Sequence, residues 1–123
     1  MSKTPVTIAI VDDDESIRNA LGNLLLAAEF HVLPFASAED FLHSLDGRAI
    51  GCLIADINLP GMSGVALTEA LAAAGRAIPA VLITARDDIA TVALLGRAPR
   101  IPYLRKPFSD HELFSAIGQV LSP

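Results

Sequence analysis

The sequence has one cysteine, no tryptophan, and fewer basic than acidic residues. With a single cysteine, Cys52, the chain cannot form an intrachain disulfide. Because Cys52 stands in an apolar run, we expect a small buried residue rather than a reactive thiol. Nine Lys and Arg against 14 Asp and Glu give a net charge of −5. That balance argues against direct nucleic-acid binding, which depends on basic side chains neutralising phosphates.

The sequence also lacks long hydrophobic stretches and low-complexity tracts. No apolar run approaches the ~20 residues of a membrane span, and the N-terminus has no apolar signal-peptide core. We therefore expect a cytoplasmic protein without membrane contact. Hydrophobic residues make up 52% and charged residues 19% of the 123-residue chain, which favours a compact fold. This length suits one domain, residues 1–123.

Short apolar segments alternate five times with segments of helical period. The predicted strands cover residues 6–11, 31–34, 51–55, 79–84 and 101–104. The predicted helices follow them, with N-caps at Asp14, Ser37, Asp87 or Asp88, and Ser109, and with ends of the second and third near Gly47 and Gly75. The alternation predicts an α/β fold in which a parallel sheet has helices on both faces.

Charged residues stand where three of these strands end. Asp12 and Asp13 follow the first strand, Asp56 follows the third, and Lys106 follows the fifth. Because ligands bind at the carboxyl ends of parallel strands, we expect these side chains to converge. Converging carboxylates repel one another and need a cation, which a hard metal ion such as Mg²⁺ supplies, with Mn²⁺ as an alternative.

This pattern is typical of phosphate chemistry. Asp56 can attack phosphorus and form an aspartyl phosphate. A Mg²⁺ ion would be held by Asp13, Asp56 and the backbone carbonyl of Asn58, with Asp12 holding metal-bound water. Lys106 supplies a cation for a phosphoryl oxygen or for the free carboxylate, and Thr84 can donate its hydroxyl to the same group.

Pro107 directly follows Lys106. A residue before proline is restricted to extended geometry, and the bond that joins the two is a candidate cis peptide. The Lys106–Pro107 pair therefore predicts a fixed turn at the end of the fifth strand.

Taken together, these segments resemble the receiver domain of two-component response regulators over essentially the whole chain. The matching segments are residues 11–14, 56–64, 82–85 and 106–108. Residues 35–42 and the Lys-Pro-Phe segment are most similar to the FixJ-like branch. The resemblance implies a doubly wound, flavodoxin-like sheet of five strands in the order 2-1-3-4-5.

The resemblance also implies a signalling role in a phosphorelay. Asp56 would accept phosphate from a sensor histidine kinase or a phosphotransfer protein, and the domain would catalyse only its own phosphorylation and dephosphorylation. Thr84 and Tyr103 would couple phosphorylation to the surface of the fourth helix, fifth strand and fifth helix. That surface would bind an output domain, a protein target or a second copy of the chain.

Two alternatives remain open on the sequence alone. A Mg²⁺-dependent phosphatase or phosphotransferase of the aspartyl-phosphate type normally needs a general acid two residues after its nucleophile, where this chain has Asn58. It also needs a cap, for which the chain has no room. A pseudo-receiver that binds a partner without phosphate should have lost an acid or the lysine, and this sequence keeps them.

The chain departs from the usual receiver pattern before the fifth strand. Pro99 stands where receivers have a glycine, and proline cannot adopt positive φ, so we predict a short or irregular fourth helix ending near Gly96. Pro102 removes a backbone donor as the fifth strand starts. Two positions beside the site are candidates for setting the phosphate lifetime: Asn58, two residues after Asp56, and Arg86, two residues after Thr84.

Overall fold

The computed structural model describes residues 5–45 and 47–121. The sequence is compatible with an output domain after Pro123. That end of the chain lies outside the described residues, and the domain limits 1–123 stay a prediction. The strands are β1 (Thr7–Val11), β2 (His31–Phe35), β3 (Cys52–Asp56), β4 (Ala80–Thr84) and β5 (Tyr103–Arg105). The helices are α1 (Glu15–Ala27), α2 (Ala38–His43), α3 (Gly64–Ala73), α4 (Ile89–Gly96) and α5 (Asp110–Leu121).

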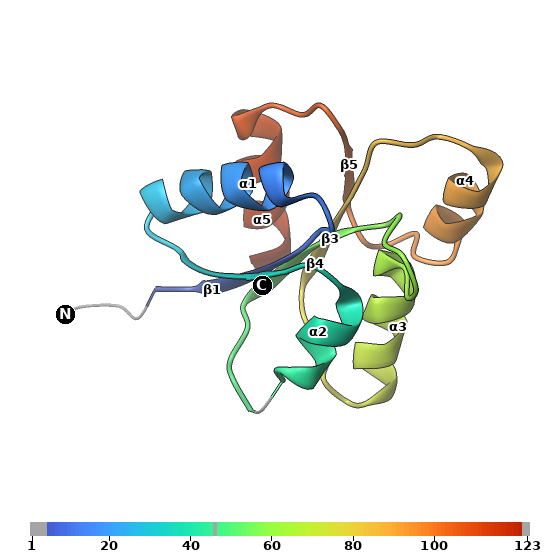
Figure 1. Ribbon diagram of the computed structural model, residues 1–123, viewed down its shortest axis with the longest axis horizontal. Helices are drawn as coiled ribbons and strands as arrows, with labels where there is room; N and C mark the ends of the chain where they lie inside the picture. Colours follow the sequence, from blue (N-terminus) through green and yellow to red (C-terminus); the bar gives the residue numbers. More distant parts are fainter. Residues whose placement is uncertain (1–4, 46, 122–123) are drawn as a thin grey trace.

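All strands pair in parallel in the order β2-β1-β3-β4-β5, which confirms the predicted doubly wound sheet. In Figure 1, α1 and α5 lie on one side of the sheet and α2 and α3 on the other. β1, β3 and β4 are the interior strands, and β3 and β4 are buried along their whole length, as expected for strands covered on both faces. Among the described residues, no helix is long and apolar enough to cross a membrane.

The hydrophobic core has two layers because side chains of a strand alternate between its faces. From β1, Ile8 and Ile10 pack with the buried residues of α1 and α5. Ala9 and Val11 point the other way and pack with the buried residues of α2 and α3. The sheet is thereby held rigidly between two helical layers, and the ends of its strands are fixed in space.

The predicted N-caps are confirmed. Asp14 Oδ1 accepts the backbone N–H of Ser16 at 2.8 Å, and Ser37 Oγ accepts that of Asp40 at 3.0 Å. Ser109 and Glu112 form a reciprocal capping box at the start of α5. For α4 the cap is Asp88, the second of the two candidates, whose side chain accepts from the N–H of Thr91.

Most predicted strand ends differ from the structure by at most one residue, but two predicted boundaries were wrong by more than that. The second helix, α2, ends at His43 instead of near Gly47, because the N–H and the hydroxyl of Ser44 both donate to the Phe41 carbonyl and tighten the last turn. The last strand, β5, starts at Tyr103 and not at residue 101. Pro102 has no N–H to donate, and it joins the sheet only through its carbonyl, which accepts from Leu82.

The short fourth helix is confirmed, with α4 ending at Gly96. After it the N–H groups of Arg97 and Ala98 donate to the carbonyls of Leu94 and Leu95, three residues back. Gly96 does not have positive φ. The helix therefore ends in tight turns leading to Pro99, not in a left-handed glycine cap.

Candidate functional site

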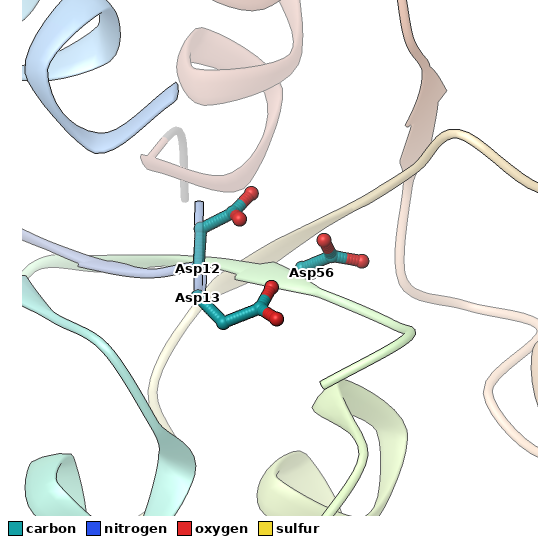
Figure 2. Close-up of side chains that lie close together, drawn as sticks. All are labelled: Asp12, Asp13 and Asp56. Atoms are coloured by element: carbon teal, nitrogen blue, oxygen red, sulfur yellow. The ribbon is translucent and has the colours of Figure 1, made fainter. Parts of the chain in front are cut away.

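Three carboxylates meet at the ends of β1 and β3. One oxygen each from Asp12, Asp13 and Asp56 lies within 4.8 Å of the others, and Figure 2 shows the three side chains gathered at this edge of the sheet. The register explains this, since Val11 pairs with Ala55, so that the next residue of each strand comes alongside the other. Asp12 is fully buried and Asp56 is 7% exposed, whereas Asp13 faces solvent.

Backbone N–H groups hold one oxygen of each buried carboxylate. Asp12 Oδ1 accepts the N–H of Asp14 at 2.9 Å, and Asp56 Oδ1 accepts the N–H of Asn58 at 2.8 Å. Arg18 Nη1 donates to the Asp12 carbonyl at 2.7 Å. Each carboxylate is thus fixed through one oxygen, and its Oδ2 is turned to the interior of the site.

Lys106 joins these two free oxygens. Its Nζ donates to Asp12 Oδ2 at 2.9 Å and to Asp56 Oδ2 at 3.1 Å, and its side chain is only 16% exposed. The backbone N–H of Lys106 donates to the Thr84 carbonyl, and the Lys106–Pro107 peptide is cis. Burial alone would lower the pKa of Lys106, but the hydrogen bonds and charges of Asp12 and Asp56 outweigh it and raise the pKa. The lysine is therefore a cation at neutral pH.

A second polar group lies beside Asp56. The Thr84 hydroxyl donates to Asn58 Oδ1 at 2.7 Å, and Asn58 Nδ2 donates to Thr91 Oγ1 at 3.0 Å. Thr84 and Thr91 are both buried. Thr91 was not among the residues predicted for the site, and its local signal in the sequence is a polar side chain three residues after the Asp88 cap.

Two other predicted residues, Arg86 and Tyr103, lie apart from the cluster of Asp12, Asp13 and Asp56. Tyr103 is 52% exposed on β5. The Arg86 guanidinium donates to Asp88, with Nε at 2.9 Å from Oδ2. The structure thus brings Asp12, Asp13, Asp56 and Lys106 together, places Thr84 and Asn58 next to them, and directs Arg86 to the N-cap of α4.

The donor set fits a magnesium ion. Three carboxylates within mutual reach offer the hard oxygen ligands that Mg²⁺ and Mn²⁺ prefer, and no sulfur or imidazole ligand lies among them. The single lysine neutralises part of this charge, because two of the three carboxylates share it.

An apolar groove of about 840 Å³ opens beside Lys106. It is lined by one side of α1 and by the segment before α5, chiefly Ile17, Ala20, Leu24, Pro107 and Phe108. Lys106 is part of its lining, so the groove borders the acidic site.

The fold is that of a response regulator receiver domain. Residues 8–118 match that family, and the chain belongs to it. Within the family it is FixJ-like: it is 32% identical to the transcriptional regulatory protein FixJ of Bradyrhizobium diazoefficiens over 93% of this chain and 56% of that protein.

Two further relatives agree with this assignment. The chain is 36% identical to the response regulator protein TmoT of Ectopseudomonas mendocina, over 98% of this chain and 55% of that protein. The solved structure of the response regulator StyR superposes with a TM-score of 0.84 at 43% identity, covering 96% of this chain and 60% of that one. The chain spans about half the length of the curated relatives it matches.

Proposed function

We propose that Asp56 is the phosphoacceptor of this receiver domain. A carboxylate oxygen of Asp56 attacks the phosphorus of a phosphohistidine or small phosphodonor, the P–N or P–O bond to the donor breaks, and an aspartyl phosphate forms. The observation that carries the proposal is the position of Asp56 Oδ2. It lies at a strand end, 3.1 Å from the Lys106 ammonium, with Asp12 and Asp13 alongside.

Each neighbour has a role in this transfer. Lys106 neutralises the Asp56 carboxylate before the reaction and stabilises a phosphoryl oxygen afterwards. The set of ligands for Mg²⁺, or Mn²⁺, would be Asp12, Asp13, Asp56 and the backbone carbonyl of Asn58. The metal ion would offset the negative charge of the phosphoryl group. The domain catalyses only its own phosphorylation and dephosphorylation, and Asn58 and Arg86 influence how long the phosphate lasts.

Phosphorylation is proposed to act on a partner through Thr84 and Tyr103. The phosphoryl group adds charge and acceptor oxygens that recruit the Thr84 hydroxyl, and exposed Tyr103 lies one strand away from it, on β5. The resulting change at α4, β5 and α5 alters binding to an output domain, a protein target or a second copy of the chain. The greater length of the relatives supports an output domain.

The donor is proposed to be a sensor histidine kinase or a phosphotransfer protein. The apolar groove beside Lys106 supports this, because a helical donor domain seated there would bring its phosphohistidine next to Asp56. Ala20→Arg would place a bulky charge in the groove. It should slow transfer from a kinase that phosphorylates the wild type and leave labelling by acetyl phosphate unchanged.

The decisive experiment uses acetyl phosphate with Mg²⁺ and reads the intact mass of the wild type and of Asp56→Asn. A gain of one phosphoryl group that needs Mg²⁺ and is absent from the variant is the expected result. Folded wild-type protein that binds Mg²⁺ but gains no mass would overturn the proposal and favour a domain that binds its partner without phosphate.

A further inference from the structure

The connection between β4 and α4 is enclosed by a ring of side-chain hydrogen bonds. The ring runs from Thr84 to Asn58, on to Thr91, and then through Asp88 and Arg86 back to Thr84. The last link is the backbone N–H of Arg86, which donates to Thr84 Oγ1 at 3.0 Å. The position of the first turn of α4 is therefore tied to the hydroxyl of Thr84.

Asn58, which follows β3, links Thr84 at the end of β4 to Thr91 in α4. Its side-chain oxygen accepts from Thr84, and its side-chain nitrogen donates to Thr91, so that each half of the amide has a partner. Its backbone N–H donates at the same time to Asp56. One residue thus contacts the phosphoacceptor, the residue at the end of β4 and the start of α4.

The hydrogen bond from Thr84 competes with the function proposed for that residue. A hydroxyl has one proton, and in the structure Asn58 Oδ1 is its nearest acceptor, at 2.7 Å, with the Arg86 carbonyl at 3.2 Å. To donate to a phosphoryl oxygen on Asp56, the Thr84 hydroxyl must leave Asn58.

Burial makes this exchange costly. When the Thr84 hydroxyl leaves, Asn58 Oδ1 loses its donor, and Asn58 is half-buried between Thr84, which is 1% exposed, and Thr91, which is 0% exposed. The arrangement in the structure is therefore one of two competing states of the same hydroxyl.

We propose that Asn58 and Thr91 form a latch that holds the Thr84 hydroxyl away from Asp56 and keeps α4 in its unphosphorylated position. Thr91 acts as a positioning residue, because it orients the Asn58 amide toward Thr84 and, among the described residues, makes its side-chain hydrogen bond to Asn58 and none to Asp56. The inference rests on the proposed phosphorylation of Asp56. It adds that part of the interaction energy of the phosphoryl group is used to open this latch.

The test measures the affinity for beryllofluoride, a tetrahedral phosphoryl analogue, in the presence of Mg²⁺. Thr91→Val keeps the branched shape and removes the hydroxyl that accepts from Asn58. The variant should bind beryllofluoride roughly two- to tenfold more tightly than the wild type, as expected for the loss of one hydrogen bond made only in the free state. Thr91→Ser should restore the wild-type affinity.

A double-mutant cycle separates the latch from a general packing effect. In a Thr84→Val background there is no hydroxyl to release, so Thr91→Val should leave the affinity unchanged. Thr68→Val, which removes a threonine hydroxyl bonded within α3, is the matched control and should have no effect. If Thr91→Val does not fold, Thr91→Ala carries the same expectation.

The results distinguish this inference from the proposed function. Equal affinity of the wild type and Thr91→Val, or an equal gain in the Thr84→Val background, would overturn the latch alone. A wild type that is not phosphorylated by acetyl phosphate and does not bind beryllofluoride would overturn the proposed function as well.

Discussion

Lys106 balances two buried carboxylates. Replacing it with Met leaves Asp12 and Asp56 facing each other without a cation, and we expect the free energy of unfolding in EDTA to fall by about 1–3 kcal/mol. Saturating Mg²⁺ should recover much of this loss, because the metal supplies the missing positive charge. Urea denaturation with EDTA and with Mg²⁺ measures both values.

Arg105→Met is the matched control for this substitution. Arg105 is the neighbouring residue, and its partner Asp87 lies 3.3 Å away with both side chains exposed. Such a surface ion pair contributes little, about 0–1 kcal/mol, and should not depend on Mg²⁺. An equal loss in both variants, insensitive to the metal, would show that Lys106 does not balance the acids.

Cys52 should be inert in the folded protein. Burial raises the pKa of its thiol from 9.0 to about 12, so the reactive thiolate is almost absent at neutral pH. A thiol reagent at pH 8 should modify the protein only in urea. Because folding raises this pKa, the contribution of the neutral thiol to stability is complete below pH 9.0 and is lost between pH 9.0 and about 12. Rapid native labelling would contradict the buried position.

The residues of the site differ in how well the sequence could predict them. Asp12, Asp13, Asp56 and Lys106 follow from a simple rule, since each lies at or just after the end of a recognisable strand and parallel strands end at one edge. Thr91 follows from no such rule. Its role depends on a hydrogen bond to Asn58, 33 positions away, which only the packing of α4 against the β3–α3 connection creates.

At the scale of elements, α4 can end for one of two reasons: the glycine at Gly96 itself, or the tight turns that lead to Pro99. Gly96 has no positive φ, and a Cβ added there meets nothing within 4 Å. Gly96→Ala should therefore raise the free energy of unfolding by about 0.5–1 kcal/mol, because alanine is the better helix former. Urea denaturation measures the change.

Gly75→Ala is the contrasting variant. Its site is equally open, but Gly75 has a φ of +71°, which costs a residue with a Cβ about 1–2 kcal/mol. We expect this variant to lose stability. Destabilisation of a similar size by Gly96→Ala would mean that the glycine itself, and not the turns before Pro99, ends α4.

The sequence predicted the order and type of every element, because their apolar periods and caps are local signals. It misplaced the end of α2, where a serine tightened the last turn, and the start of β5, where Pro102 can use only its carbonyl. These boundaries depend on one or two hydrogen bonds at a single residue, which composition and period do not reveal.

At the scale of the whole molecule, folding itself assembles the charged edge. Asp13 and Asp56 are 43 positions apart in the chain and meet only when β1 and β3 pair. An ion that binds this cluster binds the folded state alone and should stabilise it, by about 2.7 kcal/mol at a Mg²⁺ concentration of 100 times its Kd. Thermal or urea unfolding across a Mg²⁺ titration measures this linkage.

Two adjacent acidic residues, Asp13 and Asp14, allow a test of where the Mg²⁺ ion binds. Asp13→Asn removes one of the clustered carboxylates, so it should relieve repulsion and slightly stabilise the protein in EDTA, yet abolish most of the gain from Mg²⁺. Asp14→Asn removes the same charge one residue later, where asparagine still caps α1, and it should keep the full gain. Equal Mg²⁺ responses of the two variants would mean that the ion is attracted by overall negative charge, whereas a selective loss in Asp13→Asn places it among the three carboxylates.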